Sequence, residues 1–176
     1  MSKSEYNDKY KRPLHWQIED TIVYPNGEKE VRNYENLVVN DCSVLIACLM
    51  SNQPTCKGIG YWAVGKGESN WSNENSPIPQ LTNSTLVNET FRKEILPGDI
   101  TFIDGEGNPT TSFTNSLQIT VEFTEEEANG ELREFALFGG TASANSNSGI
   151  MLNHKIHPLI CKTSGMRLKR IIRITF

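Results

Sequence analysis

Histidines are the first candidates for acid–base or metal chemistry in this chain, which has three of them. His154 and His157 lie in a segment where apolar and polar residues alternate, so we expect a strand there. On a strand, an odd separation sends two side chains to opposite faces, and the two imidazoles should not share a metal ion. His15 lies near the start of the chain. The histidines therefore predict neither a metal site nor a general base held by a second group.

Motifs for nucleophiles, phosphate and calcium are also missing. No serine lies in a Gly-x-Ser-x-Gly elbow, and no cysteine has a neighbouring histidine. Gly65 and Gly67 resemble the start of a phosphate-binding loop, but no third glycine and no Gly-Lys-Ser/Thr follows, which favours a tight turn with positive φ. The oxygen-rich run 104–109 lacks the closing glutamate of a calcium loop, which favours a hairpin turn. We predict a protein that is not an enzyme and has no cofactor.

One group of charged residues is predicted to meet. Glu134 opens the apolar run 134–138, where a carboxylate is costly to bury without a partner. Arg92 lies in 84–95, a segment with apolar residues at four-residue spacing, as on a helix that packs on a sheet. We expect Arg92, alone or together with Glu89, to form a partly buried charge pair with Glu134. The role of this pair would be architectural.

Size, charge and hydropathy exclude several classes of partner. The chain has 176 residues, enough for one domain or one domain with an arm. Its 17 Lys and Arg against 21 Asp and Glu give a net charge of −4, which predicts no nucleic-acid partner. The longest apolar run, 44–50, is about a third of the roughly 20 residues that span a bilayer. The N-terminus also lacks a signal-peptide core, so we expect no membrane insertion and synthesis in a cytoplasm.

The four cysteines occur in no Cys-x-x-Cys pair, and they are too few for a disulfide scaffold. They are Cys42, Cys48, Cys56 and Cys161. Because free cysteine behaves as a small apolar residue, we expect all four to be reduced packing residues.

Alternating apolar and polar residues predict a β-rich fold. In 117–123 every odd position is apolar, and 168–176 repeats the alternation. Two half-buried strands need a second layer to cover their apolar faces. Further strands are expected at 58–67, 100–103, 134–138 and 150–157. The expected fold class is therefore mainly β, an antiparallel β-sandwich.

Two short α-helices should pack on this sandwich. In 36–50 apolar residues recur every three or four positions, with Asn40 or Asp41 as the N-cap. The second helix is expected at 84–95, and Pro97-Gly98 should end it. The predicted architecture is a β-sandwich with one or two short helices and an extended N-terminal arm.

Residues 1–35 are predicted to form this N-terminal arm, and 36–176 to form the β-sandwich domain. The first 35 residues are polar and show no sustained period. They contain the turn signal Pro25-Asn26-Gly27. A short hairpin is one interpretation, in which 15–18 and 21–24 pair with each other or add to a sheet edge, and a loosely attached terminus is the alternative.

Three aromatic residues are candidates for an interface: Trp16, Tyr24 and Trp71. Tryptophan is enriched among residues that dominate binding energy, although each tryptophan could equally cover its own core. The run 139–149 consists of small and polar residues and is predicted to be a flexible loop that orders on assembly.

Eight short motifs follow one another in a characteristic order. They are 36–39 (Asn-Leu-Val-Val), 59–67 (Ile-Gly-Tyr-Trp-Ala-Val-Gly-Lys-Gly), 86–92 (Leu-Val-Asn-Glu-Thr-Phe-Arg), 119–123 (Ile-Thr-Val-Glu-Phe), 134–138 (Glu-Phe-Ala-Leu-Phe), 149–154 (Gly-Ile-Met-Leu-Asn-His), 158–162 (Pro-Leu-Ile-Cys-Lys) and 172–176 (Ile-Arg-Ile-Thr-Phe). Together they resemble a family of small virion proteins of tailed bacteriophages and of phage-derived contractile injection systems. Two positions depart from it: Ala136 stands where the family has Gly, and Ile172 where it often has Trp. Both are strand positions that tolerate apolar exchange.

The resemblance implies a β-sandwich subunit in a ring, baseplate, neck or fibre-attachment position of a virion. Its partners would be copies of itself and other phage structural proteins, and no catalytic residue carries over. The alternative is a receptor- or glycan-binding module of a tail fibre, in which an exposed Trp62 or Trp71 stacks on a sugar ring. A groove floored by an exposed aromatic ring and rimmed by Asn and Asp would favour the alternative. Trp71 buried against another subunit would favour the structural role.

Overall fold

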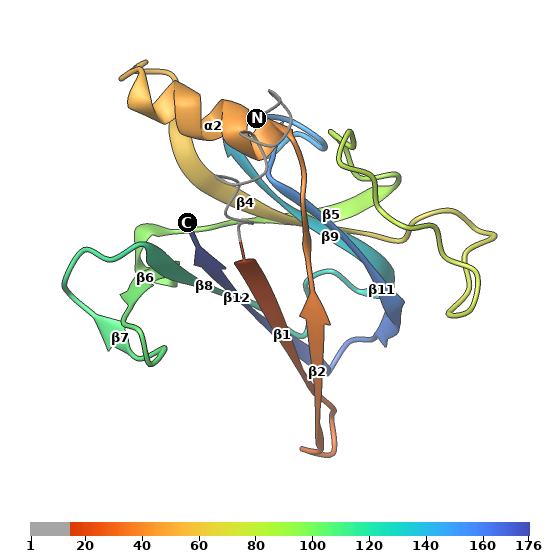
Figure 1. The fold of residues 1–176 in the computed structure, drawn as a ribbon. Coiled ribbons are helices and arrows are strands. Elements are labelled where there is room, and N and C mark those ends of the chain that lie inside the picture. The colour runs from red at the N-terminus through yellow and green to blue at the C-terminus, as the bar shows by residue number, and fades with distance from the viewer. Residues whose placement is uncertain (1–14) are drawn as a thin grey trace, which may run out of the picture.

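Two antiparallel β-sheets pack face to face, and one α-helix covers an end of the pair (Figure 1). The computed structural model describes residues 15–176. The first sheet has the order β2 (Lys29–Glu35), β1 (His15–Val23), β12 (Arg167–Thr175), β8 (Ser116–Phe123), β6 (Ile100–Ile103) and β7 (Pro109–Thr110). The second has the order β3 (Leu37–Val38), β11 (Asn153–Lys162), β9 (Gly130–Gly140), β4 (Lys57–Gly65) and β5 (Glu89–Glu94), and β10 (Ile150–Met151) also pairs with β9. The expected mainly β, antiparallel sandwich is confirmed.

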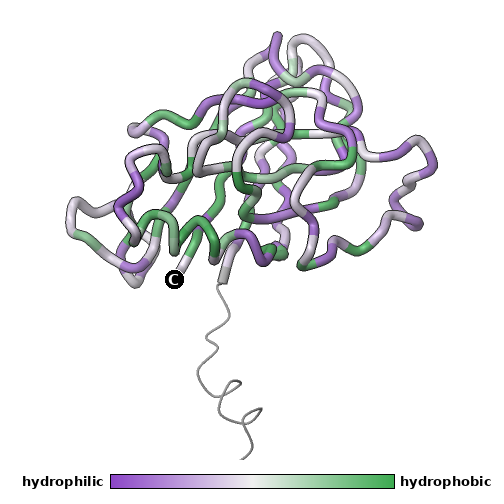
Figure 2. The backbone as a smooth tube through the Cα atoms, turned by 90° about the horizontal axis from the view of Figure 1, so that it is seen from above, coloured by the Kyte–Doolittle hydropathy of each residue, from purple (hydrophilic) through white to green (hydrophobic). Residues whose placement is uncertain are grey.

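The core lies between the sheets, where the alternating strands direct their apolar side chains. On β12, Leu168, Ile172 and Ile174 are buried in it, as the sequence predicts, and they pair through β8 and β1 with other core residues. In Figure 2 the hydrophobic positions gather toward the middle of the molecule, whereas the projecting loops are largely hydrophilic. This distribution is the one that a two-layer fold requires.

A second, smaller apolar cluster lies on the opposite face of the second sheet. On β4, Trp62 and Val64 belong to the main core and Ala63 to the smaller cluster, which also contains Ala136 and Phe138 of β9. Because β9 is covered on both faces, it appears in the sequence as a continuous apolar run rather than as an alternation.

The predicted helix at 41–50 is confirmed as α2 (Asp41–Met50). Asn40 occupies the N-cap position, but its side chain makes no capping hydrogen bond. Cys42 and Leu45 enter the main core, whereas Val44 and Met50 are exposed. The helix contacts β10, β4 and β9, so it packs on the second sheet as expected.

The predicted helix at 84–95 is wrong, because this segment contains the edge strand β5. Ile95 belongs to the main core and Phe91 packs against it, and the ring of Phe91 meets that of Phe123 edge to face, with centroids 6.0 Å apart. Two of the three predicted apolar contacts are therefore present, whereas Val87 is exposed. The segment is a strand because it pairs with the free edge of β4. Pairing with a distant strand is invisible to local spacing.

The division into an arm of residues 1–35 and a separate domain is also wrong for 15–35. The predicted pairing of 15–18 with 21–24 does not occur, because 15–23 is the single strand β1. β1 forms a hairpin with β2, whose turn closes through backbone hydrogen bonds between Tyr24 and Glu28 and between Gly27 and Tyr24. β1 pairs along its full length with β12, and its inward-facing Trp16 and Ile18 belong to the main core. The hairpin is thus an integral part of the sandwich, and the rest of the predicted arm, residues 1–14, lies outside the described residues.

The cysteines differ from the expectation of four reduced thiols. Cys48 at the end of α2 and Cys56 before β4 form a disulfide, with their Cα atoms 6.1 Å apart, within the usual range for such bonds. Cys42 is buried, which raises the pKa of its thiol to about 11, and Cys161 is exposed. None of the helices in 15–176 combines the length and the apolar character needed to cross a bilayer.

Candidate functional site

Glu134 is the centre of the first polar cluster. It is fully buried on β9, and its carboxylate accepts hydrogen bonds from the backbone N–H groups of Gly67 (3.2 Å), Val87 (3.1 Å) and Asn88 (2.8 Å). His154 Nε2 lies 3.0 Å from the same carboxylate. Four contacts replace the water that a carboxylate loses on burial, so Glu134 ties the segments after β4 and before β5 to the sheet.

The glycines at the end of β4 are required by this arrangement. A Cβ on Gly65 would lie 2.5 Å from the carbonyl oxygen of Asn88 and 2.7 Å from a carboxylate oxygen of Glu134. Gly67 has a φ of +66° and supports the indole of Trp71, which leaves no room for a side chain. The predicted tight turn with positive φ is confirmed at Gly67.

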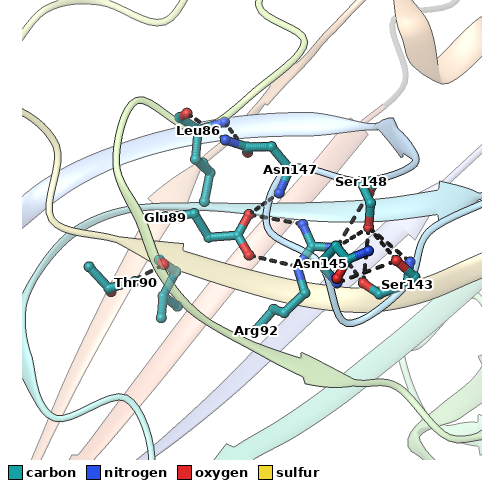
Figure 3. A network of polar contacts seen from close by, with 9 residues as sticks. Leu86, Glu89, Thr90, Arg92, Ser143, Asn145, Asn147 and Ser148 are labelled. Atoms are coloured by element: carbon teal, nitrogen blue, oxygen red, sulfur yellow. Dashed lines mark hydrogen bonds and ion pairs between the residues drawn. The ribbon is translucent and has the colours of Figure 1, made fainter.

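Arg92 forms the second cluster, and its carboxylate partner is Glu89 rather than Glu134 (Figure 3). Nε and Nη2 of Arg92 donate to the two oxygens of Glu89 at 2.6 and 2.9 Å, a bidentate pair that is almost fully buried. The guanidinium also lies over the rings of Phe138 and Tyr61, at 4.7 and 5.5 Å from their centroids. The predicted pair of Arg92 with Glu134 is therefore wrong, and Glu89, which was expected at most to join that pair, is the counter-charge instead.

A register shift in β5 explains why residues three apart on a strand meet. Val64 of β4 pairs with Phe91, but the next residue, Gly65, pairs with Glu89, so Thr90 is an extra residue in the ladder. This β-bulge turns Glu89 to the same face as Arg92. Without it, the two side chains would point to opposite faces.

The same arginine holds the loop that was predicted to be flexible. Arg92 Nη1 donates to the carbonyl oxygen of Ser143 at 2.7 Å and to the hydroxyl of Ser148 at 2.9 Å (Figure 3). Glu89 accepts from the backbone N–H of Asn147, whose amide in turn bonds both backbone groups of Leu86. The 139–149 loop is therefore anchored by residues of its own chain, contrary to the prediction of a flexible loop that orders on assembly.

The third cluster lies inside the main core and joins the two sheets. Arg170 of β12 donates through Nη2 to Oδ2 of Asp20 on β1 at 2.9 Å, and the same nitrogen lies 3.0 Å from Nε2 of His157 on β11. His157 Nδ1 faces the carbonyl oxygen of Pro158 at 2.8 Å, so Nδ1 carries the proton and Nε2 accepts from Arg170. The guanidinium also stacks over Phe135 at 4.4 Å.

Burial sets the protonation of this core cluster. It raises the pKa of Asp20, although the charge of Arg170 acts in the opposite direction. Burial and the adjacent Arg170 hold the pKa of His157 well below its usual value. The imidazole is therefore neutral in the folded protein near pH 7.

Asp20 and Arg170 were missed in the sequence, although a local signal was present. Asp20 occupies the inward phase of β1 between Ile18 and Ile22, and Arg170 occupies the same phase of β12. A charged residue at an apolar position of an alternating strand indicates a buried ion pair. The opposite faces predicted for His154 and His157 are confirmed, since His154 contacts Glu134 and His157 contacts the main core.

The predicted interface aromatics are not exposed anchors. Trp16 lies in the main core, and Trp71 is 7% exposed against Gly67. Tyr24 packs partly on the core and donates its hydroxyl to Glu30 at 2.7 Å. Trp62 is fully buried. Neither Trp62 nor Trp71 therefore offers an open indole face for stacking on a sugar, as the alternative function required.

Among residues 15–176 the most exposed aromatic ring is instead Phe113, in the loop between β7 and β8, at 91% exposure. Its ring meets that of Phe102 on β6 edge to face, with centroids 5.5 Å apart. Phe176 is 45% exposed, and its backbone N–H donates to the carbonyl oxygen of Asn115 in the same loop. We call Phe102, Phe113 and Phe176 the aromatic edge. In Figure 1 the β6–β7 region projects from the side of the sandwich.

A polar groove of about 900 Å³ lies beside the Glu134 cluster. We call it the β4–β5 groove, because its walls are the segment after β4, the residues before β5 and the start of β9. Its lining residues are Lys66, Gly67, Glu68, Ser69, Asn70, Trp71, Val87, Asn88, Glu131 and Arg133.

Within residues 15–176, no group of three His, Cys, Asp or Glu side chains is arranged to hold a metal ion. Comparison of the chain with models of protein families, with curated proteins and with solved structures gives no match.

Proposed function

We propose that this chain is a non-enzymatic structural subunit of a phage or phage-like tail, in a ring, baseplate, neck or fibre-attachment assembly of the virion. It would act through contacts with copies of itself and with other structural proteins of the particle. The order of motifs over residues 36–176 supports this proposal, and so does the β-sandwich, which is the fold that the resemblance implies.

The aromatic edge is the observation that carries the proposal. Phe113 is almost completely exposed, and its only ring contact among residues 15–176 is Phe102, itself at the border of the first sheet. Large aromatic side chains this exposed are typical of surfaces that bind another protein, because covering them releases water from apolar area. Aromatic residues are also enriched among those that dominate binding energy. We therefore place the contact with a second copy at the aromatic edge.

The buried charges are used for architecture. Glu134 is engaged by three backbone N–H groups and His154, and Arg92 by Glu89 and the 139–149 loop. These groups fix the positions of loops, and their polar atoms are directed at the protein itself. This arrangement supports a scaffold whose surface is held in one shape for binding.

The test is the concentration dependence of the molar mass, measured by size-exclusion chromatography with light scattering. We expect the wild-type chain to self-associate. Burying one Phe contributes about 1.5–3 kcal/mol, so Phe113→Ser should raise the dissociation constant by roughly 10- to 100-fold. Val31→Ser is the matched control, because Val31 is also exposed but lies on the β2 edge, and it should leave the association unchanged.

The wild-type chain should also be mixed with the proteins encoded beside its gene, and the complexes weighed in the same way. A protein that stays monomeric at every concentration and joins none of these partners would overturn the proposal.

A further inference from the structure

The β4–β5 groove has properties of a ligand site that an assembly role does not use. Its volume of about 900 Å³ lies within the range of roughly 300–1,000 Å³ that is typical of small-molecule sites. It lies beside the Glu134 cluster, on loops of the second sheet, whereas the aromatic edge lies at β6 of the first sheet. The two features can therefore be tested separately.

The floor of the groove is held in place before any ligand arrives. Gly67 and Asn88, on opposite walls, both donate their backbone N–H groups to the buried carboxylate of Glu134. The indole of Trp71 packs against Gly67. The backbone N–H of Trp71 donates to the carbonyl oxygen of Glu68. A groove whose walls are tied to the sheet loses little conformational freedom on binding, which favours recognition by a few well-placed polar groups.

The polar side chains that face the groove are available to a ligand. Within residues 15–176, the side chains of Lys66, Glu68, Asn70, Asn88 and Glu131 make no hydrogen bond. They provide both donors and acceptors, as amides, an ammonium group and carboxylates do. Such a mixture matches a ligand that also carries donors and acceptors on every side, as a hydroxylated ring does.

The charges of the lining argue against a strongly charged ligand. Lys66 and Arg133 balance Glu68 and Glu131, so a polyanion or a polycation would meet repulsion as well as attraction. The apolar part is small: Val87 is 48% exposed, and Trp71 only 7%. An apolar ligand would therefore leave most of the polar lining unpaired.

We propose that the β4–β5 groove binds a neutral oligosaccharide, with the amides of Asn70 and Asn88 donating to and accepting from sugar hydroxyls, Glu131 accepting from them, and Val87 against the apolar face of a sugar ring. This site is independent of the proposed structural function. A subunit of a particle could bear it whether or not the aromatic edge forms the assembly contact.

The experiment uses the full chain labelled with ¹⁵N and three neutral probes: maltotriose, cellotriose and tri-N-acetylchitotriose. The chain has three tryptophans, and only Trp71 lines the groove, whereas Trp16 and Trp62 lie in the main core. At least one probe should shift the indole N–H signal of Trp71 and the backbone N–H signal of Asn88 in a saturable way. The indole signals of the two core tryptophans should remain unchanged and serve as internal references.

The variant Asn70→Ala/Asn88→Ala should weaken this binding at least tenfold, with the thermal midpoint unchanged within error. Asn75→Ala is the matched control, because Asn75 is exposed on the same loop outside the groove, and it should bind like the wild type. Absence of any saturable shift, or equal binding by both variants, overturns the proposal. Tighter binding of a heparin hexasaccharide than of every neutral probe also overturns it.

Molar mass is measured on the same samples, so a failure of the groove proposal and a failure of the assembly proposal give different results. A chain that self-associates but binds no sugar overturns only the groove proposal. A chain that stays monomeric but binds sugar overturns only the assembly proposal.

Discussion

Replacing Asp20 by Asn tests whether the buried ion pair between the sheets stabilises the fold. Asp20 and Arg170 are both fully buried and meet at 2.9 Å, whereas Oδ1 of Asp20 and Nε and Nη1 of Arg170 have no partner. Asp20→Asn keeps the shape and an oxygen that can accept from Arg170, but it removes the negative charge. The guanidinium would then be a cation in an apolar core without a counter-charge.

Removing one partner of a buried ion pair costs about 3–5 kcal/mol. Asp20→Asn retains a hydrogen bond to Arg170, and the ring of Phe135 lies 4.4 Å from the guanidinium. The free energy of unfolding should therefore fall by an amount near the lower limit, about 3 kcal/mol. For a chain of this size 1 kcal/mol corresponds to about 2–4 °C, so the thermal midpoint should fall by roughly 6–12 °C. By contrast, Asp20→Leu with Arg170→Met removes both charges, and its stability should return to within about 1 kcal/mol of the wild type or exceed it.

Urea unfolding followed by tryptophan fluorescence measures these free energies, and calorimetry gives the midpoints. The control is Glu19→Gln, one residue away on the opposite face of β1. Arg173, the partner of Glu19, lies 4.0 Å away, and both side chains are about one-third exposed. Glu19→Gln should therefore lower the free energy of unfolding by less than about 1 kcal/mol. If Asp20→Asn costs no more than Glu19→Gln, or if the double replacement recovers nothing, the stabilising role assigned to the core pair is refuted.

Three further predictions follow from the other clusters. The pKa of His157 is held well below 6.5, so the contribution of this residue to the free energy of unfolding is present above pH 6.5 and is lost as the pH falls toward the lowered pKa. His157→Gln should therefore flatten the pH dependence of the urea midpoint between pH 6.5 and 5. Arg92→Ala should cost about 3–5 kcal/mol and raise hydrogen exchange at 143–148 more than in β12, and Arg92→Lys should not restore protection because it cannot form the bidentate pair. Cys56→Ser should cost about 2–3 kcal/mol in urea, and a reducing agent should destabilise the wild type to the same level without affecting this variant.

The elements that local patterns predicted correctly are those whose burial follows from alternation or helical spacing alone. β8 alternates through 119–123, and β12 alternates apart from Arg170 and Ile171, because one face of each strand meets the core. α2 shows helical spacing and a stop signal, and its bounds agree with the prediction. In these cases the chain's own periodicity carries the information.

The failures occurred where a distant segment decides the structure. Val87, Phe91 and Ile95 have a helical spacing, but the free edge of β4 makes the segment a strand, and the bulge at Thr90 pairs Arg92 with a residue three positions away. The partners of a buried charge depend on the same non-local register, so the sequence could indicate that Glu134 needs partners but not that backbone N–H groups would supply them.

The position of β12 has a consequence for the synthesis of the protein. β12 follows every other strand in the chain, yet it lies in the middle of the first sheet and separates β1 from β8. The contact between Asp20 and Arg170 spans 150 residues, which a ribosome adds in about 8–30 s at 5–20 residues per second. Throughout that interval Trp16 and the other inward residues of β1 lack their neighbour, and the nascent chain needs protection by chaperones or fast completion. A chain that stops before β12 would lose the centre of a sheet rather than its edge, so incomplete products should be cleared as unfolded protein.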